Sequence, residues 1–164
     1  MNNERISIRE ICREDDAAIA EIVRENLKNH RLDIPGTAYY DPQLDCLSRY
    51  YSEVSDARIY FVAENESGEL VGGVGMEPLA WRKGSGELQK LYVSAKLQRR
   101  GIGQALLERI EAYAKSIGLE CLYLETHSNL KAALNLYEKN GYHRIERPAE
   151  VIHSAMDLFY IKEL

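Results

Sequence analysis

The chain has 164 residues, of which 45% are hydrophobic and 29% are charged, a composition typical of one soluble globular domain covering residues 1–164. Its formal net charge is −5, so it lacks the basic surface with which general nucleic-acid binders displace counterions from phosphates. No apolar run approaches the roughly 18 residues of a membrane span, and the charged start is unlike a signal peptide. We therefore expect a cytoplasmic protein with neither a nucleic-acid nor a membrane partner.

The first third of the chain is mainly helical in pattern. Alternation from Arg5 to Cys12 predicts a short strand, and the acidic residues 14–16 suit the positive end of a following helix. That helix carries an apolar stripe at spacings of three and four residues, made of Ile19, Ile22, Val23 and Leu27. Pro35-Gly36 interrupts the chain, and Asp41-Pro42 begins a second predicted helix that runs through Tyr51.

From residue 58 onward, strands separated by polar turns replace the helical pattern. Three β-rich segments, at residues 59–63, 70–74 and 87–93, predict an antiparallel meander. A long amphipathic helix then runs from residue 101 to about residue 117, where Gly118 ends it, with one apolar face made of Ile102, Leu106, Ile110, Tyr113 and Ile117. A strand at 121–124, a helix at 130–139 and two final strands, around Tyr142 and at 156–161, complete an α+β pattern with a mixed sheet.

The cysteines and histidines are few and widely spaced. Cys12, Cys46 and Cys121 form no CxxC pair, so we interpret them as buried apolar residues in a reducing compartment. The four histidines are equally scattered, and the sequence predicts no metal site.

The segment most informative about chemistry joins a predicted strand to the long helix and reads Gln98-Arg99-Arg100-Gly101-Ile102-Gly103-Gln104. Gly101 and Gly103 allow a ligand to approach the backbone closely, and the N–H groups at the helix start point to the same place. Arg99 and Arg100 add charges suited to phosphate oxygens. The segment predicts a pyrophosphate site, with a plain helix N-terminus bearing surface arginines as the alternative. A Walker loop would need Gly-Lys-Ser/Thr here, and a Rossmann loop a third glycine where Leu106 stands.

The same segment fits the Q/R-x-x-G-x-G/A loop that binds acyl-coenzyme A in the GNAT superfamily of N-acetyltransferases, which this chain resembles. Residues 87–93, Glu-Leu-Gln-Lys-Leu-Tyr-Val, look like the strand that precedes this loop in the family. Residues 136–142, Leu-Tyr-Glu-Lys-Asn-Gly-Tyr, closely resemble the family's LYEKxGF motif. The resemblance implies a GNAT-like α+β fold, with a mixed, mostly antiparallel central sheet of about six or seven strands flanked by about four helices.

The resemblance also implies acetyl-CoA as cosubstrate, with no metal. The pantetheine arm would pair with the strand that ends at Val93, where main-chain N–H groups near Leu91 and Val93 would polarise the thioester carbonyl. The phosphates would lie on the loop residues Gln98, Arg99, Arg100, Gly101, Ile102, Gly103 and Gln104. The family usually carries an asparagine where this chain has Leu130. The adjacent Asn129 is a candidate cofactor contact, but we favour the alternative that it caps the following helix.

Acetyl transfer to an amine requires an acid for the leaving thiolate and a base for the amine. Tyr137 is the candidate general acid, because a phenol of pKa about 10 suits a thiolate of similar basicity. Glu87 occupies a position where many family members hold a carboxylate and is the candidate base, with Glu125 and His127 as alternatives. The non-catalytic interpretations are a core aromatic residue for Tyr137 and ordinary polar strand-end residues for the other three.

The resemblance therefore implies an N-acetyltransferase that moves an acetyl group by direct attack of a primary amine, on a small molecule or a peptide. A non-catalytic acyl-CoA sensor on the same fold and a scaffold for a protein partner remain as alternatives. Segments 30–51 and 146–155 would form the acceptor walls, and the acidic balance of the chain favours a cationic amine. The acceptor's identity is not encoded in a recognisable motif, and a homodimer, common in the family, is left open.

Overall fold

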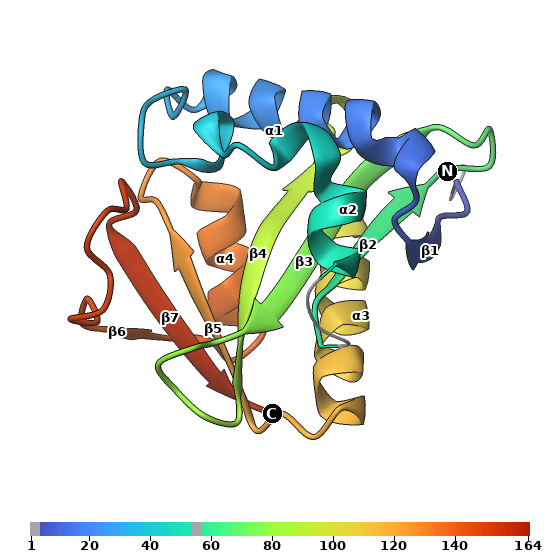
Figure 1. Ribbon diagram of the computed structural model, residues 1–164. Coiled ribbons are helices and arrows are strands. Elements are labelled where there is room, and N and C mark those ends of the chain that lie inside the picture. The colour runs from blue at the N-terminus through green and yellow to red at the C-terminus, as the bar shows by residue number, and fades with distance from the viewer. Residues whose placement is uncertain (1–3, 54–56) are drawn as a thin grey trace.

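The computed structural model describes residues 4–53 and 57–164, which build one seven-stranded sheet (Figure 1). Its strands are β1 (Ser7–Glu10), β2 (Ile59–Glu64), β3 (Leu70–Pro78), β4 (Ser85–Val93), β5 (Cys121–Thr126), β6 (His143–Ile145) and β7 (Leu158–Glu163). They lie in the order β1-β2-β3-β4-β5-β7-β6, with β4 and β5 parallel and the other neighbours antiparallel. The predicted α+β fold with a mixed, mostly antiparallel sheet is confirmed.

Helices cover both faces of this sheet. On one face lie α1 (Asp16–Asn29) and α2 (Leu47–Ser52), and on the other lie α3 (Ile102–Ser116) and α4 (Lys131–Lys139) (Figure 1). The alternation of β2 serves both layers, because Tyr60 packs with the α1 and α2 side chains whereas Phe61 packs with those of α3. Among the described residues, no helix has the length and apolar character needed to cross a membrane.

Two predicted helices differ from the observed ones. The helix expected from Asp41 starts later, as a single 3-10 turn at Leu44–Cys46 followed by α2, because the residue before Pro42 is held in an extended conformation. On α3 the expected apolar face is shorter at its end. Ile117 is 39% exposed, since the helix stops at Ser116 and Gly118 takes a left-handed φ of 82°.

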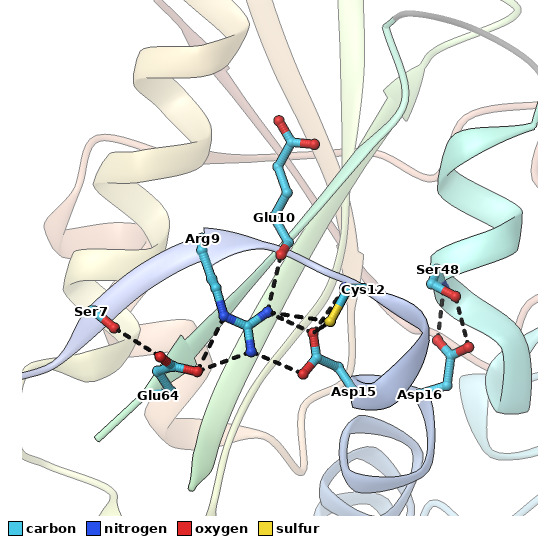
Figure 2. Close-up of polar contacts among 8 residues, drawn as sticks. All are labelled: Ser7, Arg9, Glu10, Cys12, Asp15, Asp16, Ser48 and Glu64. Atoms are coloured by element: carbon cyan, nitrogen blue, oxygen red, sulfur yellow. Dashed lines mark hydrogen bonds and ion pairs between the residues drawn. The ribbon is translucent and has the colours of Figure 1, made fainter. Parts of the chain in front are cut away.

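The expectation that all three cysteines are buried is wrong for Cys12, which is exposed, whereas Cys121 is buried and Cys46 is half-buried. Cys12 lies where the chain leaves β1 and turns into α1, and its backbone N–H donates to Asp15 Oδ2 at 2.8 Å (Figure 2). Its thiol is 3.2 Å from the same oxygen. Position 12 thus contributes to the start of the helix rather than to the core.

The parallel pair β4–β5 creates the opening on which the site depends. Its pairing runs from Ser85 with Cys121 to Leu88 with Leu124, and β4 then continues to Val93 with no pairing to β5 (Figure 1). The two strands separate beyond this point. The backbone of residues 89–93 is left without a strand partner on that side, among the residues that the structure describes.

Candidate active site

A cavity of about 710 Å³ lies where β4 and β5 separate, walled by α1, the loop before α2, β4, the turn into α3, and α4. It brings together most of the predicted site residues: Glu87, Leu91, Val93, Gln98, Arg99, Gly101, Ile102, Gly103, Gln104, Glu125 and Tyr137. Arg100, Asn129 and His127 are not among the described residues that line it. The cavity therefore connects the turn before α3 with the candidate acid and base.

One end of the cavity is made by the turn into α3. Gly101 is the N-cap of the helix with φ 79°, a left-handed conformation that favours glycine. At Gly103 an added Cβ would lie 3.3 Å from Leu136 Cδ2 and 3.8 Å from Val93 Cγ2, so this helix start fits closely between α4 and β4. The first N–H groups of α3 have no partner within the helix and are available to an anion.

The two arginines of this turn are not equivalent. Arg99 lines the cavity and makes no ion pair with another described residue. Arg100 is exposed, and its Nη1 lies 3.8 Å from Glu4 Oε2. Only Arg99 is placed beside the helix N-terminus on the cavity wall.

Gln98 holds the end of β4 together with a residue that the sequence did not single out. Its Nε2 donates to Asn26 Oδ1 at 2.9 Å and to the Val93 carbonyl at 3.3 Å. Asn26 Nδ2 donates to the same carbonyl at 2.9 Å, although Asn26 lies on α1 and is only 4% exposed. The sequence could have pointed to Asn26, because it lies between Val23 and Leu27 in the apolar stripe of the helix and a buried amide needs polar partners.

The interpretation of Asn129 as a helix cap is wrong. Leu130 holds the N-cap position of α4, and no side chain caps it. Asn129 Nδ2 instead donates to the His30 carbonyl at 2.9 Å, satisfying one of the free carbonyls at the C-terminus of α1. Its role as a cofactor contact stays a prediction.

Tyr137 is 5% exposed and reaches the cavity from α4. Its ring packs edge-on against Tyr142, with centroids 5.7 Å apart. The hydroxyl forms no hydrogen bond with any residue that the structure describes, and burial raises the pKa of the phenol well above its ordinary value. The phenol therefore keeps its proton at neutral pH, and the raised pKa makes it a weaker acid than the phenol of pKa about 10 on which the sequence prediction was based.

Glu87 faces the same cavity from the paired part of β4, opposite Tyr123 and two residues before the strand loses its pairing with β5. Burial, followed by the nearby carboxylates of Glu125 and Glu77, raises the pKa of Glu87 to about 7. Gln89 Nε2 donates to Glu87 Oε2 at 3.3 Å and opposes this rise. A carboxyl group with this pKa changes protonation state near neutral pH, as a general base must.

The two alternative bases are placed differently. Glu125 lines the cavity on β5 and accepts a hydrogen bond from the Tyr123 hydroxyl at 3.1 Å. His127 lies in the following turn, where its Nδ1 accepts the Asn129 N–H at 3.0 Å and its Nε2 is 3.8 Å from Asp157 Oδ2. One ring nitrogen thus accepts from the turn and the other lies near a carboxylate just before β7, which favours a structural role for His127.

Comparison with known proteins agrees with this architecture. A model of the acetyltransferase (GNAT) family matches residues 19–142. The uncharacterized N-acetyltransferase YjgM of Escherichia coli (strain K12) is 35% identical over 141 residues, 85% of this chain and 83% of that protein. The IAA acetyltransferase of Azospirillum brasilense is 36% identical over 84 residues, 51% of this chain and 54% of that protein.

Solved structures share the fold. An acetyltransferase of the GNAT family from Staphylococcus aureus Mu50 gives a TM-score of 0.84 at 23% identity, covering 97% of this chain and 99% of that one. The PaiA N-acetyltransferase from Thermoplasma acidophilum, solved in complex with coenzyme A, gives 0.75 at 21% identity, covering 98% and 99%. With the family match over most of its length, a split between β4 and β5, and a glycine turn at the head of α3, this chain belongs to the GNAT family of acetyltransferases.

Proposed function

We propose that this protein transfers the acetyl group of acetyl-CoA to a primary amine. The observation that carries the proposal is the single cavity that joins the anion-binding turn before α3 to Glu87 and Tyr137. One end offers helix N–H groups and Arg99 to phosphates, and the other offers a base and an acid on the wall of the same space.

The residues present fit acetyl-CoA. The narrow space at Gly103, between Leu136 and Val93, suits a group that must approach the backbone of the helix start. The free edge of β4 at residues 89–93 suits an extended arm with amide groups. The coenzyme A complex of the related fold from Thermoplasma acidophilum supports the same assignment. When bound, acetyl-CoA supplies the activated thioester.

In this proposal each chemical role falls to a group on the cavity wall. Main-chain N–H groups of Leu91 and Val93 bind and polarise the acyl carbonyl oxygen. Glu87 accepts a proton from the bound ammonium, and the resulting amine attacks the acyl carbon. As the carbon–sulfur bond breaks, Tyr137 donates its proton to the departing sulfur and regains one from the acylated nitrogen. Near neutral pH about half of the Glu87 carboxyl groups, with pKa about 7, are ionised and able to accept a proton, whereas the Tyr137 phenol is protonated.

The acceptor end of the cavity favours a positively charged amine. Neither Glu87 nor Glu125 forms an ion pair with a described lysine or arginine, although both line the cavity. A protonated amine, on a small molecule or a peptide, would supply the missing positive charge. Release of its proton to Glu87 then makes it a nucleophile.

The test is a thiol-release assay with acetyl-CoA and a panel of primary amines, comparing the wild type with Tyr137→Phe. We expect turnover by the wild type and a loss of about 10²- to 10⁴-fold in kcat for the variant, with acetyl-CoA binding kept. Binding of acetyl-CoA without thiol release with any amine would instead indicate an acyl-CoA sensor. Full activity of Tyr137→Phe would make the tyrosine a packing residue.

A further inference from the structure

Lys90 occupies a backbone position that lysine rarely adopts. Its φ is 49°, in the left-handed region that favours glycine. The β3–β4 register shifts here, from Gly75 opposite Gln89 to Gly73 opposite Tyr92. Lys90 and Leu91 together therefore stand opposite one residue of β3, which defines a β-bulge. Strain of this kind is frequent at functional sites, so the contacts of the Lys90 side chain decide whether it has a role.

The bulge turns two consecutive side chains to the same face of the sheet. In a regular strand Gln89 and Lys90 would point to opposite faces. Here Gln89 accepts a hydrogen bond from the Tyr51 hydroxyl of α2 at 2.7 Å, and Lys90 Nζ lies 2.8 Å from Asp41 Oδ2 in the loop before α2. The Lys90 carbonyl is fixed as well, by the Tyr60 hydroxyl at 3.0 Å.

The ion pair is buried at its cationic end, since 8% of the Lys90 side chain and 32% of the Asp41 side chain are exposed. Both residues line the cavity. A buried ion pair is a weak source of stability, because desolvation of the two charges offsets their attraction. The Lys90–Asp41 pair instead connects the bulge that carries Leu91 with the loop before α2 that contains Asp41, which is called the acceptor-side loop below.

Lys90 also shares its face of the sheet with Glu87. The charged and titratable groups around Glu87 are Glu77 from β3, Glu125 and Tyr123 from β5, Tyr50 and Tyr51 from α2, Arg58 and Lys90. Arg58 is engaged by Glu77, with Nε 3.0 Å from Oε2. Lys90 therefore provides positive charge on β4 itself, and it lowers the pKa of Glu87 against the two carboxylates.

We propose that Lys90 is a positioning residue of the transfer reaction, which, with Asp41 as its counter-charge, sets the charge around Glu87 and fixes the acceptor-side loop against the bulge. This inference rests on the proposed function, in which Glu87 is the base. It assigns a role to a lysine and an aspartate that the reaction scheme does not otherwise use.

The test measures kcat/KM as a function of pH in variants that remove either charge. The acid limb of this profile, the part in which kcat/KM rises with pH, reports the pKa of the base. Lys90→Met removes a positive charge that lowers the pKa of Glu87, so the limb moves to higher pH, by up to about half a unit. Asp41→Asn leaves the Lys90 ammonium uncompensated, so the limb moves to lower pH by a similar amount. The double variant removes both charges and returns the limb close to the wild-type position.

Matched variants separate this role from a structural one. Lys90→Arg keeps the charge and retains the wild-type limb, whereas Lys90→Gly relieves the backbone strain and still shifts the limb as Lys90→Met does. Lys115→Met and Glu21→Gln, at exposed positions, change the net charge equally and leave the profile in place. Shifts of the same sign in Lys90→Met and Asp41→Asn, or a wild-type limb in Lys90→Gly, would overturn the inference.

Glu87→Gln tells the two failures apart. If Glu87→Gln moves the acid limb up toward the pKa of the amine while the Lys90 and Asp41 variants leave it unmoved, the positioning role fails and the proposed function stands. If Glu87→Gln keeps the wild-type limb, the assignment of the base fails, and with it the inference that depends on it.

Discussion

Two groups of carboxylates in this protein have opposite electrostatic surroundings. Beside β1, Arg9 donates to both oxygens of Asp15, at 2.7 and 3.0 Å, and to Glu64 at 2.9 Å (Figure 2). At the cavity, Glu87 and Glu125 lie near each other with no described lysine or arginine in ion-pair contact. Each carboxylate of the first group has a guanidinium partner within the fold, whereas neither carboxylate of the second group has a cation in ion-pair contact among the described residues.

The pKa values follow this difference. Burial opposes ionisation of Asp15, but hydrogen bonds from Arg9 and from the Cys12 N–H outweigh it and keep the pKa of Asp15 below its ordinary value. At Glu87 burial is reinforced by Glu125 and Glu77, and the pKa rises to about 7. The contrast indicates that a carboxylate whose pKa is raised at a cost to stability is a candidate for function, and one whose pKa is lowered by partners in the fold is a candidate for structure.

The largest expected difference between the two groups is in activity. Glu87→Gln should lower kcat by roughly 10²-fold or more near pH 7, because the proposed base is lost, and the rate should recover as pH rises toward the pKa of the amine. Glu64→Gln, in the compensated group, should leave kcat within about twofold. Steady-state rates from pH 6 to 10 measure both. Alkaline rescue in Glu125→Gln, with none in Glu87→Gln, would move the base to β5.

Stability should change in opposite directions. Arg9→Met leaves Asp15 buried without its cation and should lower the free energy of unfolding by about 1–3 kcal/mol, a range reduced because Arg9 is 39% exposed. Glu87→Gln removes a carboxylate that folding disfavours and should raise the same free energy at pH 8 by about 1–3 kcal/mol. Urea unfolding at one pH compares the variants. Destabilisation by Glu87→Gln at pH 8 would contradict the raised pKa.

The same contrast should appear as two different pH windows. The pKa of Glu87 is raised from 4.5 to about 7, so its favourable contribution is complete below pH 4.5 and is lost as pH rises to 7. The stability gap between Glu87→Gln and the wild type should therefore open between those values. The pKa of Asp15 is lowered, so its contribution is present above about pH 4 and is lost as pH falls further. Unfolding of wild type, Glu87→Gln and Asp15→Asn at pH 3, 5 and 8 would test both windows.

The smallest expected effect compares the two arginines at the other end of the cavity. Arg99 lacks an ion partner among the described residues, whereas Arg100 lies near Glu4. Arg99→Ala should weaken acetyl-CoA binding by about 1–2 kcal/mol, and Arg100→Ala by clearly less. Calorimetric titration with acetyl-CoA measures both affinities. Equal losses would mean that both side chains reach the phosphates.

The sequence predicted what local patterns encode. The stripe of α1, the turn at Gly101 and the strand ending at Val93 follow from periodicity, glycine placement and a recognisable motif, and each lies where expected. The predicted helix at Asp41 failed because proline chemistry acts on the preceding residue.

What the sequence could not predict depends on contacts between distant segments. Asn26 and Gln98 form a hydrogen bond although they are 72 positions apart in the sequence. Lys90 on β4 forms an ion pair with Asp41 in the loop before α2. The bulge at Lys90 contains no glycine or asparagine, the residues from which a left-handed backbone conformation could have been predicted. The pairing of charges also depends on residues from separate parts of the chain. Neither the pairing of Asp15 nor the raised pKa of Glu87 could therefore be predicted from a local stretch of sequence.

Beyond Leu88 the edge of β4 that faces β5 has no strand partner among the described residues. An extended arm lying along residues 89–93 would act as an added strand, and the amides there would pass from solvent-accessible to protected. Hydrogen–deuterium exchange should therefore slow at Leu91 and Val93 when acetyl-CoA is added, while Leu122 and Leu124, already paired within the sheet, should exchange slowly in both states. The acyl donor would in this sense be the strand that closes the gap between β4 and β5.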